Sequence, residues 1–116
     1  MNRSFAFIVI AALTLCASQI CQAAEKKNPE ANKLAVEGAK AAKNQDFDKA
    51  VDLLKKATAI DHKYADELSA VYQQRGYAAT KDQRYGDAIS DYEEALKLTP
   101  QQAPRIHAAA FATIPP

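Results

Sequence analysis

The sequence has few of the residues that mark strand-rich or disulfide-bonded proteins. Its 116 residues contain no tryptophan, three glycines and two cysteines. Alanine, lysine, glutamate, glutamine and leucine, which favour helices, are abundant instead. Both cysteines, Cys16 and Cys21, lie in the segment 1–23. If that segment is removed, disulfides, thiol catalysis and cysteine metal sites are excluded from the mature protein.

The chain also lacks an excess of charge of either sign. It carries 15 basic and 14 acidic residues, so its formal net charge is +1 with histidine neutral. Removing Arg3 with the segment 1–23 leaves 14 of each, so the mature charge is zero. We therefore expect no nucleic-acid partner, because such proteins present a basic patch. A basic block for an anionic membrane surface is missing too.

The start of the chain has the layout of a secretory signal peptide. Arg3 is followed by the apolar run Phe5 to Cys16 and then by small residues up to Ala24. We predict a signal peptide over residues 1–23, with Ala24 as the alternative last residue. The alternative is an uncleaved anchor, because Phe5 to Ala24 is an uncharged stretch of about the length that crosses a bilayer. We thus expect a periplasmic or secreted protein, or a membrane-anchored one if the segment stays.

The remainder of the chain predicts helices separated by short turns. Apolar residues at spacings of three and four indicate helices over about 30–43 and 47–60. Further helices are expected from residue 63 or 64 to 81, over 85–99 and over 104–114. Asp46 is the expected N-cap of the second helix, and Pro104 suits the first turn of the last one. The predicted fold class is therefore all-α.

The helix over about 47–60 and its predecessor form a pair with the same residue pattern as the pair that ends at residue 99. Each patterned residue of the second pair follows its counterpart in the first by the interval that separates Gly38 from Gly76. Large and small residues recur at positions where two crossing helices need them, and the second copy also has a helix-stopping proline. The second copy carries Tyr72, Gly76, Tyr85, Ala88, Tyr92, Ala95 and Pro100, and the first carries Leu34, Gly38, Phe47, Ala50, Leu54 and Ala57. This pattern resembles the tetratricopeptide repeat family.

The resemblance implies a domain organisation. It suggests two repeats, 31–64 and 69–102, after a flexible leader over 24–30, and a capping helix and tail over 103–116. The cap is supported by Ile106 and Ala110, which follow Tyr72 and Gly76 by one repeat length of the family. Gly38 should pack against Ala50, and Gly76 against its counterpart Ala88, since small side chains allow helices to cross closely. Glu37 and Arg75 depart from the family, which usually has leucine there.

In this family the first helix of each unit lines a concave groove, so the resemblance implies a site that binds a protein or peptide. We call equivalent positions of successive repeats a column. Carried over by column, the expected groove residues are Asn32, Ala35, Ala39, Lys43, Gln73, Gln74, Tyr77, Lys81, His107 and Phe111. The alternative is a structural subunit of a homo-oligomer whose apolar surfaces are buried against copies of itself.

The sequence shows no pattern of an enzyme. No serine with a histidine base, paired carboxylates or glycine-rich phosphate loop can be placed. Asp61, His62 and Asp66 lack the spacing of metal ligands. We expect no catalytic residue, no cofactor and no bound metal.

Overall fold

The computed structural model describes residues 28–116, so the predicted signal peptide and most of the predicted leader lie outside the described residues. The described part contains helices and no strand. In chain order the elements are α2 (Pro29–Lys43), α3 (Phe47–Ile60), η1 (His62–Tyr64), α4 (Ala65–Lys81), α5 (Tyr85–Leu98), η2 (Pro100–Gln102) and α6 (Ala103–Thr113). The predicted all-α class, two helix-turn-helix repeats with a capping helix, is confirmed for these residues.

Local signals explain where the first helices begin. The side-chain oxygen of Asn28 accepts hydrogen bonds from the backbone N–H groups of Glu30 and Ala31, at 3.1 and 3.3 Å. Pro29 takes the first helical position, where its missing N–H is not needed. The helix therefore starts inside the predicted leader. Asp46 caps α3 as predicted, accepting from the N–H of Lys49 at 3.4 Å.

Both turns between paired helices have the same backbone geometry. Gln45 and Gln83, one in each turn, have φ values of 62° and 60°. After the first helix, the N–H of Gln45 donates to the carbonyl of Ala42, and the next N–H donates to Ala41. The second turn repeats this pair of bonds. A left-handed residue with these bonds closes a helix and reverses the chain, although glycine is the usual residue there.

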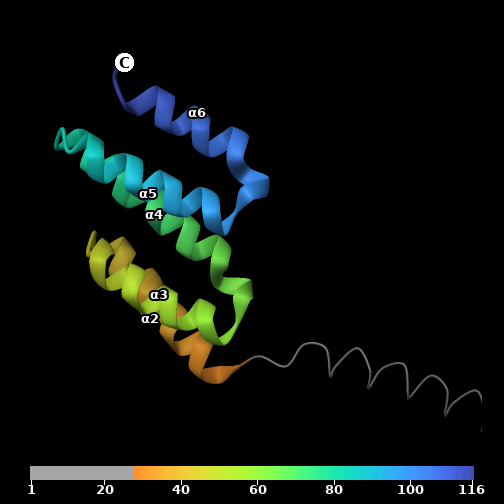
Figure 1. Ribbon diagram of the computed structural model, residues 1–116. Helices are drawn as coiled ribbons and strands as arrows, with labels where there is room; N and C mark the ends of the chain where they lie inside the picture. Colours follow the sequence, from red (N-terminus) through yellow and green to blue (C-terminus); the bar gives the residue numbers. More distant parts are fainter. Residues whose placement is uncertain (1–27) are drawn as a thin grey trace, which may run out of the picture.

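The helices form a stack of two hairpins with one helix added at the end (Figure 1). Within the hairpins α2 packs on α3, and α4 packs on α5. The stack continues because α3 contacts α4, while α6 lies across α5 and α4. The early start predicted for the third helix, at residue 63 or 64, appears as η1, which leads directly into α4. No helix among residues 28–116 is long and apolar enough to cross a membrane.

Small residues let the paired helices approach, as the repeat pattern predicts. A Cβ atom added to Gly38 would lie 3.4 Å from the carbonyl oxygen of Ala50, and one added to Gly76 would lie 3.3 Å from that of Ala88. Both alanines are fully buried. A larger side chain at these crossings would push the helices apart.

One continuous core runs through the stack and ends under α6. Leu54 and Ile106 are its largest apolar side chains with almost no exposed surface, at 1% and 0%. Ala110 and Ile114 of the tail are half-buried against the same core. The last helix therefore covers the second repeat, as expected for the end of a repeat array.

Candidate functional site

A hollow of about 380 Å³ lies between α4 and α6. We call it the trough. Its wall from α4 consists of Gln73, Gln74 and Tyr77, and its remaining lining residues are Tyr92, Ala109, Ala112 and Thr113. Three of the predicted groove residues therefore meet in one depression whose lining is largely apolar.

Tyr77 is the most prominent side chain of the trough. It is 47% exposed, and the Nζ atom of Lys81 lies 4.6 Å from the centre of its ring. This cation–π contact ties a predicted groove lysine to the trough. An aromatic ring that is half-exposed beside a charged group offers an apolar contact to a partner without requiring any change in the core.

Hydrogen bonds hold side chains that line the trough. The amide nitrogen of Gln73 donates to the Ser69 hydroxyl at 3.4 Å, which fixes one wall. The hydroxyl groups of Tyr92 and Thr113 lie 3.3 Å apart and join α5 to α6. Gln74 is exposed and makes its amide available to a partner. The trough can thus bury apolar side chains and exchange hydrogen bonds with a backbone.

The predicted groove residues of α2 have mixed environments. Ala35 is only 8% exposed and belongs to the core, so it cannot contact a partner directly. Asn32 is exposed but accepts a hydrogen bond from the Tyr64 hydroxyl at 3.4 Å. Ala39 and Lys43 are exposed, one repeat away from the trough.

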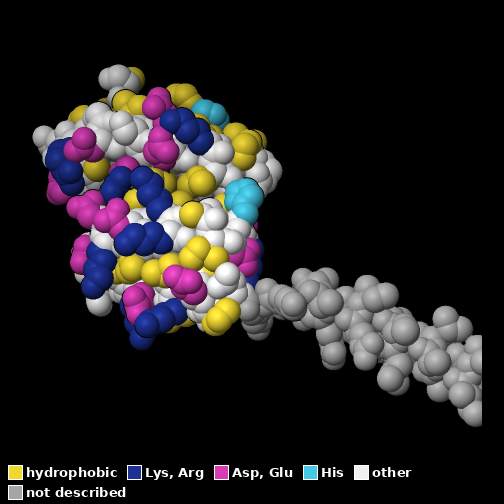
Figure 2. All heavy atoms as spheres, turned by 60° about the horizontal axis from the view of Figure 1, so that its bottom comes forward, with side chains coloured by type: hydrophobic (Ala, Val, Ile, Leu, Met, Phe, Trp, Pro, Cys, Tyr) yellow, Lys and Arg dark blue, Asp and Glu magenta, His cyan; other side chains and the backbone are white. Residues whose placement is uncertain are grey.

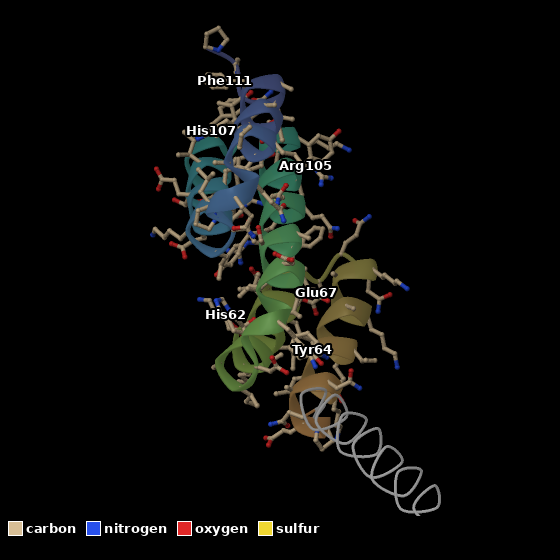
Figure 3. The ribbon with its side chains drawn as sticks, turned by 90° about the vertical axis from the view of Figure 1, so that its right-hand side faces the viewer. His62, Tyr64, Glu67, Arg105, His107 and Phe111 are labelled. Atoms are coloured by element: carbon tan, nitrogen blue, oxygen red, sulfur yellow. The ribbon has the colours of Figure 1, made fainter. Side chains whose placement is uncertain are left out.

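His107 and Phe111 do not join the other predicted residues. They line a second hollow, of about 400 Å³, together with Ala110, Ile114 and the two terminal prolines. Figure 3 shows both side chains on one side of α6 and Arg105 on the other. The sequence placed them in the groove by column, but α6 has no following helix in the described part, so this column faces outward.

A bridge between the repeats was not anticipated from the sequence. Arg75 of α4 donates to both carboxylate oxygens of Asp91 on α5, at 2.7 to 3.1 Å. It also donates to Asp48 of α3, in the first repeat, at 2.9 Å. The hydrogen bond to Asp91 is the main reason that the pKa of Arg75 lies above its ordinary value. Arg75 therefore replaces the family's leucine with a polar link that holds three helices.

Charge is otherwise spread without a large patch of one sign. Figure 2 shows basic and acidic side chains intermixed over one face of the stack. Within residues 28–116 no group of three histidine, cysteine, aspartate or glutamate side chains could hold a metal ion. His62 and Asp61 lie at the α3–η1 junction, where the Asp61 side chain accepts from the N–H of Lys63 at 3.1 Å.

Comparison with known proteins assigns the second hairpin. A family model described as "Tetratricopeptide repeat" matches residues 69–102, which cover most of α4 and all of α5 and η2. This hairpin is therefore a tetratricopeptide repeat, a non-catalytic repeat fold that generally mediates protein–protein interactions. Searches of curated proteins and of solved structures gave no significant match.

Proposed function

We propose that this chain is an exported, non-catalytic scaffold that binds a peptide or protein partner in the trough between α4 and α6. The observation that carries the proposal is the half-exposed Tyr77 beside an apolar hollow of about 380 Å³. This volume is in the usual range of a ligand-binding cleft, about 300 to 1,000 Å³. An amphipathic helix or an extended segment that presents one apolar side chain would fit such a depression.

The exposed residues around the trough suggest how the partner is oriented. Gln74 can pair with a partner's backbone, while Lys81 beside Tyr77 favours an acidic or carbonyl group at that end. Asn32, Ala39 and Lys43 extend this surface onto α2 for a longer partner. No cofactor, metal or nucleic acid is part of the proposal.

Partner binding is tested by comparing two side chains of matched exposure. Tyr77 is 47% exposed in the trough, and Ile89 is 46% exposed on α5, outside it. Capture from the host envelope with a photo-reactive residue at Gln74 should cross-link the partner, whereas the same residue at Ser90 should not. Tyr77→Ala should then weaken binding about tenfold or more, as truncation of an aromatic hot spot does. Ile89→Ala should leave binding unchanged.

The proposal fails if a partner cross-linked at Gln74 binds Tyr77→Ala as tightly as the native protein. It also fails if Ser90 gives the same cross-link as Gln74, because the partner then does not use the trough. Tyr77→Ala should change the melting temperature little, since the side chain is half in water.

Export is the second part of the proposal, to the periplasm or the medium. It rests on the signal-like segment over residues 1–23. The intact mass of the protein recovered from its host should correspond to a start at Ala24 or Glu25. A mass that includes Met1 to Ala23 would instead favour the membrane-anchored alternative.

A further inference from the structure

A row of exposed side chains runs along α4 beside the trough. Its members follow one another at intervals of three, four, three and four residues, and all of them are exposed: Glu67, Ala70, Gln74, Tyr77 and Lys81. Residues three and four apart lie on the same face of a helix, so these five form a single stripe. From residue 67 to residue 81 the stripe is about 21 Å long at the rise of an α-helix. We call it the α4 row.

The two ends of the α4 row carry opposite charges. Glu67 lies in the first turn of α4, beside a second acid, Asp66, and Lys81 is the last residue of the helix. Within residues 28–116 neither Glu67 nor Lys81 forms an ion pair. The middle of the row, from residue 70 to residue 77, is uncharged and includes Tyr77 of the trough. Both end charges are therefore available to a partner that lies along the row.

The lining of the trough favours a helical partner over an extended one. Because its walls are helices, their backbone N–H and C=O groups are already bonded within α4 and α6. The Gln73 amide donates to Ser69, and the Thr113 hydroxyl donates to the carbonyl of Ala109 at 2.9 Å. Gln74 is left as the amide that can meet a partner. An extended segment would bury several backbone groups here without partners, which is costly, whereas a helix bonds its own.

We propose that the partner bound in the trough is an amphipathic helix that lies along the α4 row, antiparallel to α4. This inference rests on the proposed function and specifies the form and direction of the partner. Apolar side chains at intervals of three and four on the partner would contact Tyr77 and Ala70. Ala109 and Ala112 on the opposite wall are small, which lets a helix approach α6 closely.

The end charges of the row determine the direction. Helices favour acidic residues in the first turn and basic residues in the last turn, because of the helix dipole. α4 follows this rule itself, with Glu67 at its start and Lys81 at its end. A partner helix with the same asymmetry matches both ends only when it runs antiparallel, because its acidic turn then lies at Lys81 and its basic turn at Glu67. In the parallel direction like charges would meet at both ends, which is unfavourable.

Synthetic peptides that differ in one feature test the proposal on the full chain as its host processes it. The reference probe is a helical peptide of about 15 residues, which matches the length of the row. It carries leucine at intervals of three and four, glutamate in its first turn and lysine in its last. In an NMR titration it should shift the amide signals of Gln74 and Tyr77. A spin label at its N-terminus should broaden the signals around Lys81 and leave those around Glu67 unchanged.

Two altered probes separate the helix from its charges. A proline in the middle of the peptide keeps the leucines but breaks the helix, and should weaken binding about tenfold or more. Exchange of the glutamates and lysines should weaken binding about fivefold, because both end pairs then repel, and the loss should shrink at high salt. The double variant Glu67→Lys, Lys81→Glu should reverse this preference. Lys56→Glu, exposed on α3 outside the row, is the control and should keep it.

Each result decides one part of the inference. A proline-containing probe that binds as tightly as the helical one overturns the helical partner. Broadening around Glu67 overturns the antiparallel direction, and an unchanged preference in the double variant overturns the role of the end charges, provided that circular dichroism shows an intact fold. If no probe shifts the signals of the trough, the inference falls as a whole. The proposed function is judged separately, by the cross-link at Gln74, which requires no assumption about the form of the partner.

Discussion

The two repeats share a backbone but are held together by different chemistry. In the first repeat the side chains packed against Gly38 at the crossing of α2 and α3 are apolar, Leu53 and Leu54. In the second repeat the column of Leu53 holds Asp91, which is buried and paired with Arg75. The equivalent space at the two helix crossings is thus occupied by aliphatic side chains in the first repeat and by an ion pair in the second.

The junction that follows each repeat differs in the same sense. Thr99 ends the second repeat and is fully buried, with its hydroxyl 2.8 Å from that of Ser69. The corresponding residues of the first repeat are Ala31 and Asp61. Asp61 is partly exposed and makes only local contacts, at the start of η1.

The difference follows from the position of each repeat in the stack. The second repeat lies between the first repeat and α6, so its buried polar side chains, Ser69, Asp91 and Thr99, are shielded from water and need hydrogen-bond partners within the protein. The first repeat has one side open to water and can leave its charges there. The repeat pattern therefore determines how the paired helices cross. The helices packed on either side of a repeat determine which of its polar groups are buried and need partners.

The largest effect on stability is expected from weakening the packing of α6 on the second repeat. Ile106 is fully buried under α6, so Ile106→Ala should lower the free energy of unfolding by about 2 to 5 kcal/mol. Chemical denaturation measures the loss, and hydrogen exchange should show it in α4 and α5 more than in α2. Ile60→Ala is the control, since Ile60 is 41% exposed in the first repeat and should cost about 0.5 kcal/mol or less. An unchanged midpoint for Ile106→Ala would contradict the capping role.

The next effect concerns the ion pair between Arg75 and Asp91, which has no counterpart at the equivalent positions of the first repeat, Glu37 and Leu53. Asp91→Ala should cost about 1 to 3 kcal/mol, because Arg75 keeps its charge, partly buried, with only Asp48 to pair. The double change Arg75→Met, Asp91→Leu places at the Asp91 column the leucine that the first repeat has there, and it removes the Arg75 charge as well. It should cost less than Asp91→Ala in the same denaturation experiment, because no charge is left unpaired. If the double variant is the less stable one, the pair itself stabilises the crossing.

The three glycines provide a graded test of how closely each repeat is packed. An added Cβ would lie 2.8 Å from Leu54 Cγ at Gly38, no closer than 3.3 Å to any atom at Gly76, and in open space at Gly86. Alanine gains up to about 1 kcal/mol of helix propensity over glycine, whereas overpacking costs about 1 to 3 kcal/mol. We therefore expect Gly38→Ala to destabilise, Gly76→Ala to be near neutral and Gly86→Ala to stabilise. Thermal unfolding ranks the three, and a larger loss at Gly76 than at Gly38 would contradict the packing.

Most of the fold was predictable because it depends on local signals. Periodicity, the Asp46 cap and Pro100 place the helices within one or two positions of their observed bounds. Gly38 and Gly76 mark the crossings by their spacing alone. The link from Arg75 to Asp48 and Asp91 was missed because it depends on the register of three helices, which no spacing within one helix reveals.

The site was less predictable than the fold. The position of a residue within its repeat indicates what its side chain faces only when the next helix is known. Gln73 and Tyr77 face the trough since α6 follows them. The column of Tyr77 turns Phe111 of α6 to the outside, and the column of Gln73 buries Ala35 of α2. The sequence could reveal the apolar character of these positions but not which of them share one hollow.

The smallest expected effect is a difference in pH response between the junction after the first repeat, at Asp61, and the junction after the second, at Thr99. The pKa of Asp61 lies below its ordinary value of 3.8, mainly because its side chain accepts a hydrogen bond from the backbone N–H of Lys63. A carboxylate whose pKa is lower in the folded state stabilises that state above about pH 3.8, and this contribution is lost as the pH falls through the folded value. Thr99, which occupies the same column, does not titrate. Amide protection, corrected for the intrinsic rate at each pH, should therefore fall at residues 62–65 on going from pH 7 to pH 3, and hold at residues 100–103. Asp61→Asn keeps the accepting oxygen but not the charge, so it should remove the pH dependence at the first junction. An equal fall at both junctions would mean that acid loosens the whole stack, and that the two repeats do not differ in this respect.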